Sequence, residues 1–401
     1  MSAEAQRTLF LDITRLVTRA GAGPLTGIDR VERAYLRALI ERGARHFLCS
    51  RTALGWLMIS DGQSAQVLDW IDRPETLPVP ALAARLIARP RRTPGLEAAL
   101  RGIATARIRP GALEGWLGRA GSGRWISVGH MNLNASVLGA ARGAGLGVGV
   151  MIHDTIPLDH PAWSGKGAPA RLAAMIAATA QTADLILTPS RSAANDLRRH
   201  LGPSAARLLP ALLGVEAHEA DPALLPATFD PAQASLVALG TLEPRKNFGL
   251  LLDVWDGFVR DRPAARVPHL HLIGRPGWGY DDLMTRLKAL AARSVPVFHH
   301  PDLPDPAVAA MLDQARALLA PSRAEGFGLP PTEAAQRGLP VLATDLAVTR
   351  ELLGDYPDYL GADDLAGWSA AISAKATVAL KRTPLSLPDW TAHFNLVFNH
   401  F

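Results

Sequence analysis

Short apolar runs alternate with amphipathic stretches along most of the chain, and this pattern predicts an α/β protein. The runs TLFLDIT at residues 8–14, LILT at 185–188 and SLVALG at 235–240 have the length and composition of buried strands. The stretches between such runs repeat their apolar residues at helical spacing, as Val31 and Tyr35 do. Strands that alternate with helices in this way predict parallel βαβ units, whose ligands bind at the carboxyl ends of the strands.

The positions of most strands and helices follow from the same pattern. In the first half, strands are predicted at 8–14, 46–51, 55–60, 125–128, 147–153 and 185–188, and helices after Arg30, at 166–183 and at 191–200. The second and third of these strands form a predicted hairpin, whereas residues 61–123 contain helical pieces broken by proline and glycine. In the second half, a helix is predicted between each pair of successive strands, at 235–240, 269–273, 295–299, 317–320 and 340–343.

A chain of 401 residues is long enough for two domains, each with its own hydrophobic core. Residues 216–231 lack periodicity and are the predicted linker. The first domain is therefore expected at residues 1–220 and the second at 232–387. Residues 388–401 form an amphipathic tail that needs a surface to cover, with a shared face of Trp390, Phe394, Val397 and Phe398.

The composition, 48% apolar and 20% charged, is typical of a soluble globular protein and excludes the disordered and fibrous classes. No stretch approaches the length of a transmembrane helix, and the first residues lack the pattern of a secretory signal. We therefore expect a cytoplasmic protein. Cys49 is the only cysteine, which excludes an intrachain disulfide and a zinc site built on cysteines.

The net charge of +5 is unevenly distributed, because the first half of the chain is basic and the second half is acidic. The densest basic stretch, residues 85–109, contains Arg85, Arg89, Arg91, Arg92, Arg101, Arg107 and Arg109. Such a patch can meet anionic lipid head groups, nucleic acid or an anionic glycan, and the alternative is a solvated arginine-rich face. The stretch contains no aromatic residue, which disfavours nucleic-acid binding.

Two glutamates and a glycine-rich loop mark the strongest candidate site. The stretch PSRAEGFGLPPTE at residues 321–333 predicts a strand end, a tight loop with Gly326 and Gly328, and a helix that starts at the two prolines. Glu325 lies on the loop and Glu333 about one turn into the helix, so both carboxylates can face one ligand. A helix N-terminus with glycine amides attracts anions, whereas carboxylates bind hydroxyls. The combination predicts a ligand that carries both phosphate and sugar.

A vicinal pair of cations, Arg245 and Lys246, follows the predicted strand 235–240 and a turn. A guanidinium fork beside an ammonium point charge suits a diphosphate. In isolation such a pair is more often plain surface. Its place on the same sheet as the Glu325 loop favours a binding site instead.

Other patterns count against alternative chemistries. Gly21, Gly23 and Gly27 miss the G-x-G-x-x-G spacing of dinucleotide sites, which disfavours a nicotinamide enzyme. The aspartate pairs at 281–282 and 363–364 stand at predicted helix starts, where capping accounts for them, and no D-x-D metal pattern is present. Four further histidines lie in or beside predicted strands and are interpreted as structural: His269, His271, His299 and His300.

Three ordered motifs resemble a known family. GTLEPRKN, HLIGRPGWG and PSRAEGFGLPPTEAAQRGLPVLAT are similar to the retaining glycosyltransferases of family 4, which have the GT-B fold of two facing Rossmann-like domains. In this comparison Glu325 and Glu333 correspond to the E-x7-E pair of the family. The resemblance is close over residues 235–354 and looser over GIDR, HD and TPSRSAANDL in the first half, while residues 61–123 match nothing in the family.

The resemblance implies a role for each candidate residue. Arg245 and Lys246 would neutralise the diphosphate of a nucleotide-sugar. Glu333 would accept hydrogen bonds from the ribose hydroxyls, and Glu325 would hold the hydroxyls of the transferred sugar. His153 would lie over that sugar, and the alternative is a capped histidine at a strand end. The rest of the implied donor site consists of Gly27, Gly240, Gly274, Gly326, Phe327, Gly328 and Leu329. Asp154 is interpreted as structural, and the tail would cross back onto the N-terminal domain.

The favoured function is transfer of a hexose or deoxyhexose from a nucleotide-diphosphate sugar to a glycan or lipid-linked acceptor in bacterial surface polysaccharide biosynthesis. The implied reaction retains the anomeric configuration, with no cofactor and no obligatory metal. The alternatives are a nucleotide-sugar epimerase or phosphorylase on the same fold, a non-catalytic sensor of sugar nucleotides, and a nucleic-acid binder. The segment GRPGWG is similar to mannosyl- and rhamnosyltransferases, so GDP-mannose is the first donor to test, before UDP- and dTDP-sugars. The arginine-rich stretch allows peripheral contact with the inner face of the cytoplasmic membrane.

Overall fold

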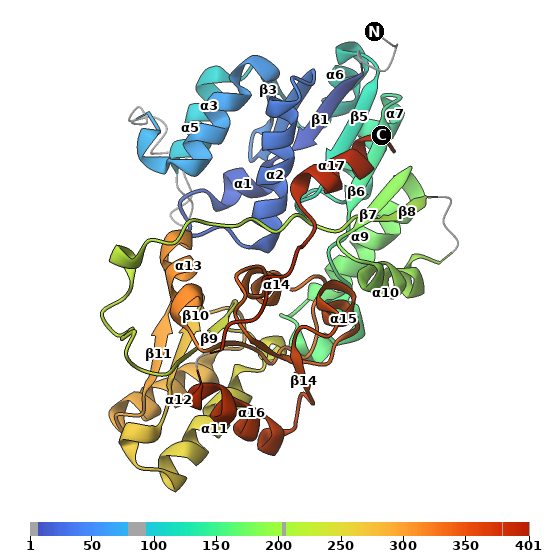
Figure 1. The fold of residues 1–401 in the computed structure, drawn as a ribbon. Coiled ribbons are helices and arrows are strands. Elements are labelled where there is room, and N and C mark those ends of the chain that lie inside the picture. Colours follow the sequence, from blue (N-terminus) through green and yellow to red (C-terminus); the bar gives the residue numbers. More distant parts are fainter. Residues whose placement is uncertain (1–6, 79–93, 203–205, 379, 401) are drawn as a thin grey trace.

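A computed structural model describes residues 7–78, 94–202, 206–378 and 380–400. These residues form two lobes, each built on one β-sheet with helices on both faces (Figure 1). The first lobe contains β1 to β8 and the second lobe contains β9 to β14. This is the GT-B fold that the resemblance predicts, with two Rossmann-like units facing each other.

The sheet of the first lobe has the strand order β4-β3-β2-β1-β5-β6-β7-β8. All neighbouring strands are parallel except the pairs β2–β3 and β3–β4, so the predicted hairpin is confirmed. The strands are β1 (Thr8–Asp12), β2 (His46–Thr52), β3 (Gly55–Ser60), β4 (Ala106–Ile108), β5 (Gly123–Ser127), β6 (Gly147–Met151), β7 (Leu185–Thr188) and β8 (Arg207–Pro210).

Helices cover both faces of this sheet because its central strands are apolar on both sides. Phe10 and Leu11, adjacent in β1, point to opposite faces and are both fully buried, one in each of the two core clusters of the lobe. The helices are α1 (Thr14–Arg19), α2 (Gly27–Glu41), α3 (Ser64–Asp72), α5 (Pro94–Ile103), α6 (Leu113–Ala120), α7 (Ala135–Gly143), α8 (Ile156–Asp159), α9 (Ala168–Thr182) and α10 (Arg191–Leu201).

The sheet of the second lobe is entirely parallel, in the order β11-β10-β9-β12-β13-β14. Its strands are β9 (Ser235–Leu239), β10 (His269–Ile273), β11 (Val297–His300), β12 (Ala317–Ala320), β13 (Val341–Thr344) and β14 (Asp358–Leu360). Its helices are α11 (Phe248–Asp261), α12 (Asp281–Ala292), α13 (Asp305–Gln314), α14 (Leu329–Gln336), α15 (Ala347–Leu353) and α16 (Leu365–Thr377).

Strand order explains why the candidate residues meet. In the second lobe the chain runs outward from β9 to β11 and then returns to the other side of β9 with β12. The loops that follow β9 and β12 therefore leave neighbouring strands in opposite directions, which opens a crevice at their carboxyl ends. The first of these loops carries Arg245 and Lys246, and the second carries Glu325.

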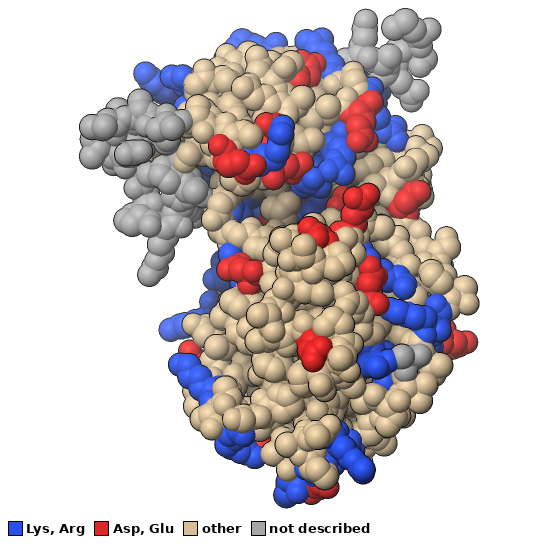
Figure 2. Space-filling model, turned by 60° about the vertical axis from the view of Figure 1, so that its left-hand side comes forward, with Lys and Arg blue, Asp and Glu red and all other residues tan. Residues whose placement is uncertain are grey.

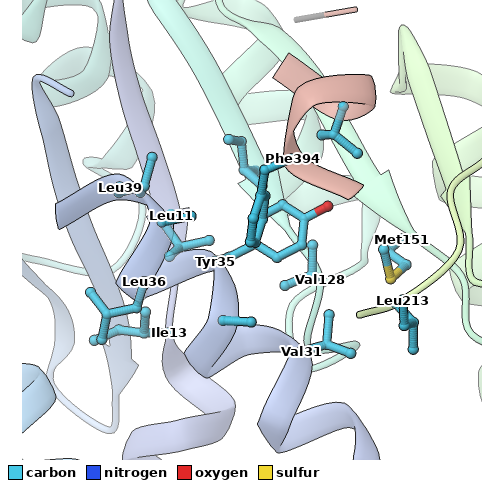
Figure 3. Packing of buried hydrophobic residues seen from close by; sticks show 14 of the residues in the cluster. Leu11, Ile13, Val31, Tyr35, Leu36, Leu39, Val128, Met151, Leu213 and Phe394 are labelled. Atoms are coloured by element: carbon cyan, nitrogen blue, oxygen red, sulfur yellow. The ribbon is translucent and has the colours of Figure 1, made fainter. Parts of the chain in front are cut away.

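The last helix, α17 (Trp390–Phe398), packs on the first lobe (Figures 1 and 3). The ring of Phe394 meets Tyr35 of α2 edge to face, with centroids 4.9 Å apart. His393 accepts a hydrogen bond from the Tyr35 hydroxyl at 2.9 Å, and its other ring nitrogen donates to the Leu212 carbonyl at 2.9 Å. The amphipathic tail thus covers apolar surface beside α2.

Several sequence-based assignments differ from the structure. Helix α1 and three short strands, β4, β8 and β14, were not predicted. Strand β6 ends at Met151, two residues before the predicted end, and β11 starts at Val297. The assignment of Asp281 as a capping residue is wrong, because Tyr280 is the N-cap of α12. Asp364 does cap α16, where its carboxylate accepts from the Gly367 amide at 2.9 Å.

Candidate active site

A cleft of about 440 Å³ lies between the two lobes. Figure 2 shows the waist of the molecule, where acidic and basic side chains face each other across the two lobes. All twelve residues proposed from the sequence for catalysis or donor binding line this cleft: Gly27, His153, Gly240, Arg245, Lys246, Gly274, Glu325, Gly326, Phe327, Gly328, Leu329 and Glu333. The fold thus brings together residues that are as much as 306 positions apart in the chain, from 27 to 333.

Arg245 and Lys246 both contact the Glu325 carboxylate. They belong to the short 3-10 helix η6 (Pro244–Lys246), and Asn247 turns the chain into α11 with a left-handed φ of 55°. Arg245 Nη1 lies 2.8 Å from Glu325 Oε2, and the Lys246 ammonium donates to Oε1. Arg245 Nε also lies 2.5 Å from a carboxylate oxygen of Glu243. Two cations with two carboxylates therefore stand at the mouth of the crevice after β9.

This cluster holds its charges despite burial. Burial opposes the ionised form of Glu325, but the Lys246 ammonium and the Arg245 guanidinium outweigh it and lower the pKa of that carboxyl to about 2. Burial likewise opposes the charge of Arg245, and the carboxylates of Glu325 and Glu243 outweigh it and raise its pKa. Glu325 is thus an anion at neutral pH and occupies the cationic pocket formed by Arg245 and Lys246.

Glu333 lies on α14 and is paired with a residue of the other lobe. The helix starts after Gly328, whose φ of 99° is left-handed, and Pro330 and Pro331 follow in its first turn. Arg30 Nη1 of α2 lies 2.7 Å from Glu333 Oε1, and Arg30 Nη2 lies 2.5 Å from an Asp305 oxygen. Burial raises the pKa of Glu333, and the guanidinium of Arg30 opposes that rise.

His153 follows β6 and is held as a neutral ring. Its Nε2 lies 2.7 Å from the Val128 carbonyl, which only accepts, so Nε2 carries the proton and Nδ1 keeps a lone pair. Its backbone amide donates to Nε2 of His130 at 3.2 Å. Burial, with a smaller contribution from the nearby Arg15, lowers the pKa of His153 to about 4. The ring can therefore accept a hydrogen bond from a hydroxyl but is not a general acid at neutral pH.

The two lobes approach each other closely at Gly326. A Cβ added there would lie 2.2 Å from the His153 carbonyl oxygen, so only glycine fits between the Glu325 loop and the end of β6. Ser190 Oγ of the first lobe donates to the Gly326 carbonyl at 2.9 Å. Asp154 also lines the cleft, and its carboxylate accepts from the Ile156 amide at 3.1 Å at the start of α8.

Sequence analysis missed four charged residues that line the cleft: Arg15, Arg30, Asp305 and Arg275. Arg15 and Arg275 each stand within three residues of a strand's carboxyl end, a position that could have drawn attention to them. Asp305 is the first residue of α13, and Arg30 lies in the GIDR segment. The ion pair between them could not be predicted from either local sequence, because the two residues belong to different lobes.

The remaining sequence assignments fall outside the cleft. His271 Nδ1 and His300 Nε2 lie 3.0 Å apart in the sheet of the second lobe, and His299 bonds the Gly274 carbonyl at 2.8 Å. Within residues 7–78, 94–202, 206–378 and 380–400, no group of His, Cys, Asp or Glu side chains has the arrangement of a metal site. Over the same residues, no helix is both long and apolar enough to cross a membrane. Four residues of the arginine-rich stretch lie outside the described part of the chain: Arg85, Arg89, Arg91 and Arg92.

Two Rossmann-like lobes, with cations and carboxylates at the switch point of the second sheet, define a protein of the GT-B fold with a cleft between its lobes. Residues 233–375, which form most of the second lobe, match the family model described as "Glycosyl transferases group 1". The serotype-specific mannosyltransferase WbdA of Escherichia coli is 30% identical over 237 residues, covering 55% of this chain and 29% of WbdA. The O-antigen chain mannosyltransferase B of Escherichia coli is 33% identical over 123 residues, covering 31% of this chain and 32% of that protein. The chain thus spans less than a third of the length of these relatives.

Among solved structures, HepE of Anabaena in complex with UDP is similar over nearly the whole chain. The TM-score is 0.58 at 14% sequence identity, covering 98% of this chain and 95% of HepE. At this identity the likeness establishes the fold.

Proposed function

We propose that this protein is a retaining glycosyltransferase that moves a hexose or deoxyhexose from a nucleotide-diphosphate sugar to a glycan or lipid-linked acceptor. The observation that carries the proposal is the pairing of Arg245 and Lys246 around Glu325 inside an interlobe cleft. The match of residues 233–375 to group 1 glycosyltransferases supports it. So does the resemblance of Glu325 and Glu333 to the E-x7-E pair of family 4.

The difficult part of such a reaction is departure of the nucleoside diphosphate. Its β-phosphate gains negative charge as the bond to the anomeric carbon breaks, and the sugar ring gains positive charge. Arg245 and Lys246 supply two fixed positive charges for the leaving group, and the amides at the start of α14 add hydrogen-bond donors. We expect no metal requirement, since these groups provide the charge stabilisation that a divalent ion otherwise supplies.

The bond between the anomeric carbon and the phosphate oxygen breaks, with its electron pair going to the phosphate. The acceptor hydroxyl oxygen forms the new bond on the same face of the sugar, so configuration is retained. The acceptor's proton passes to the departing phosphate oxygen. His153, being neutral, accepts a hydrogen bond from a sugar hydroxyl rather than donating a proton.

The two glutamates would change partners when the donor binds. The donor diphosphate displaces Glu325 from Lys246, and the freed carboxylate accepts hydrogen bonds from hydroxyls of the transferred sugar. Glu333 accepts hydrogen bonds from the ribose and shares its charge with Arg30. Glu325 therefore contacts the sugar that is transferred to the acceptor, and Glu333 contacts the nucleotide part of the donor.

Mannosyltransferase names among the relatives make GDP-mannose the first donor to test, and an O-antigen name among them favours a role in surface polysaccharide biosynthesis. A cytoplasmic location with peripheral contact to the inner membrane face through the arginine-rich stretch fits an acceptor that is linked to lipid. UDP- and dTDP-sugars are the competing donors.

A thermal-shift screen with GDP-, UDP- and dTDP-sugars tests the proposal directly. A true donor present at about 100 times its dissociation constant adds roughly 2.7 kcal/mol to stability. Transfer by the matching donor is then followed by NMR, where the anomeric coupling of the product reports retention. If none of these nucleotides stabilises the protein, the assignment as a glycosyltransferase fails.

A further inference from the structure

Two arginines of α1 are held in place by one buried carboxylate at the edge of the cleft. Arg15 Nε lies 2.6 Å from Asp29 Oδ1, and Arg19 Nε lies 2.9 Å from Asp29 Oδ2. Asp29 also accepts the amide and the hydroxyl of Thr26, at 2.8 and 2.6 Å, in the capping box of α2. The carboxylate is fully buried and its two oxygens are saturated with donors.

This arrangement leaves a surplus of positive charge. Two guanidinium groups share one carboxylate, so Arg15, Arg19 and Asp29 carry a net charge of about +1. Arg15 Nη2 is used by the Thr26 hydroxyl at 3.3 Å, but Nη1 of Arg15 and the terminal nitrogens of Arg19 have no hydrogen-bond partner among the described residues. The side chains are 20% and 32% exposed, so these donors are reachable from outside.

Of the two arginines, Arg15 reaches the cleft from the first lobe, while Arg19, held by the same carboxylate, is not among the residues that line it. Arg15 lines the cleft, and it is close enough to His153 to lower the pKa of that ring. Arg245 and Lys246 belong to the second lobe and already provide two positive charges for the diphosphate of a donor. An anion held by Arg15 would therefore lie on the His153 side of the reacting sugar.

We propose that Arg15 and Arg19 form a binding site for a phosphate group of the acceptor. This inference rests on the proposed glycosyl transfer and specifies the class of its acceptor. Guanidinium groups fixed in orientation bind phosphate through charge-assisted, often bidentate hydrogen bonds. Asp29 fixes both groups before any ligand enters, so little side-chain entropy is lost on binding.

The position of the site sets where in the acceptor the phosphate must lie. Arg15 and His153 share one wall of a cleft of about 440 Å³, so the phosphate and the attacked hydroxyl belong to the same small part of the acceptor. A sugar joined through phosphate to a lipid meets this condition at its reducing end. The protein would then add its sugar early in the assembly of a lipid-linked glycan, after a reaction that couples a sugar phosphate to the lipid.

A pair of matched probes tests the site: octyl α-mannosyl phosphate, which carries the phosphate, and octyl α-mannoside, which does not. Their affinities are measured by calorimetry with the donor subsite filled by the nucleoside diphosphate that stabilises the protein most. We expect the wild type to bind the phosphate probe at least about tenfold more tightly than the neutral one, as charge-assisted hydrogen bonds predict. Arg15→Gln and Arg19→Gln should each reduce this preference, and the double variant should abolish it.

Two further variants keep the result interpretable. Arg15→Lys retains the charge without the fork and should keep part of the preference even if Arg15→Gln folds poorly. Arg286→Gln removes an arginine of similar exposure that pairs with Asp253 at 2.6 Å on the second lobe, and it should leave the preference unchanged.

Three outcomes overturn the inference. The first is a wild type that binds both probes equally, and the second is an Arg15→Gln, Arg19→Gln double variant that keeps the full preference. The third is a loss of nucleoside-diphosphate affinity in the variants with the probe preference intact, which would assign the arginines to the donor. Nucleotide binding by the wild type is measured independently of these three outcomes. The acceptor-phosphate site can therefore be refuted while the proposed transferase activity is still supported.

Discussion

Arg30 Nη1 lies 2.7 Å from Glu333 Oε1, and this ion pair joins the first lobe to the carboxylate proposed to hold the donor ribose. The same guanidinium reaches Asp305 at 2.5 Å, so one side chain holds two acids of the opposite lobe. If Glu333 holds the ribose as proposed, the ribose hydroxyls and Arg30 would compete for, or share, the same carboxylate. Donor binding would then be coupled to the relative position of the lobes through this contact.

Replacement of Arg30 by Gln should loosen the contact between the lobes. Glu333 and Asp305 would lose the guanidinium that they share, and we expect a loss of about 2–4 kcal/mol in the free energy of unfolding. Small-angle X-ray scattering should show a larger radius of gyration for the donor-free variant. Arg350→Gln, which breaks an exposed surface pair with Asp345, should leave both the stability and the radius of gyration essentially unchanged. An unaltered radius in Arg30→Gln would contradict the coupling.

Lys246→Ala should strongly reduce the rate of transfer while the protein remains folded. The substitution removes one of two cations that face the leaving diphosphate, and a loss of about 10²–10³ in kcat is typical for such a group. Arg245 still pairs with Glu325 at 2.8 Å, so that carboxylate keeps a partner. Lys288→Ala, on the exposed side of α12, is the matched control and should keep wild-type turnover. Wild-type turnover by Lys246→Ala itself would refute the site.

Substitutions of the two glutamates should affect different kinetic constants of the transfer reaction. Glu333→Gln should mainly raise the KM for the donor, by roughly tenfold, since the lost charge weakens hydrogen bonds from a ribose that is bound equally in ground and transition states. Glu325→Gln should instead lower kcat, by about 10² or more, because it acts at the sugar that reacts. Steady-state kinetics with varied donor concentration distinguish them. The opposite pattern, with KM changed only by Glu325→Gln, would exchange the two roles.

Acid should weaken the attachment of the tail at His393. Burial opposes the charged ring and lowers the pKa of this histidine to about 4, below its usual value of about 6.5. The neutral ring accepts a hydrogen bond from Tyr35. The folded state binds fewer protons, so the contribution of His393 is complete above pH 6.5 and is lost as the pH falls toward 4, up to about 3 kcal/mol. The stability difference between the wild type and His393→Gln should therefore narrow over that interval. A difference that is constant from pH 7 to pH 4.5 would contradict this.

Phe394→Ala should lower the free energy of unfolding by about 3–5 kcal/mol, because the Phe394 ring of α17 is buried against Tyr35 of α2. Leu396→Ala, two positions away, removes a side chain that is 37% exposed and should cost far less. Denaturant unfolding followed by fluorescence and circular dichroism measures both. Equal effects would mean that α17 does not rest on the first lobe as described.

The spacing of apolar residues in the sequence was sufficient to predict the central strands and the long helices. Runs such as 8–14 and 317–320 are buried on both faces, so their apolar residues are continuous and their signal is strong. The three strands that were missed, β4, β8 and β14, all lie at the edges of the sheets. An edge strand has one neighbour and is partly exposed, so it needs no apolar run and leaves little trace in the sequence.

The candidate site, too, could be predicted only in part from the sequence. Arg245, Lys246 and Glu325 could be proposed from the sequence, because chemically specialised residues beside strand ends and a glycine-rich loop indicate a ligand site locally. Their mutual contact followed only from the pairing of β9 with β12, which places two loops about 80 residues apart in sequence side by side.

The sequence by itself determined that the chain forms two α/β units, which residues stand at the ends of their strands, and what chemistry those residues can perform. Only the tertiary structure decided that Arg30 meets Glu333, 303 positions away, and that Asp29 holds Arg15 beside His153. The physical reason is that strand and helix formation depends on the periodicity of neighbouring residues. An ion pair between lobes depends instead on how two separately formed units pack, and no local pattern records that.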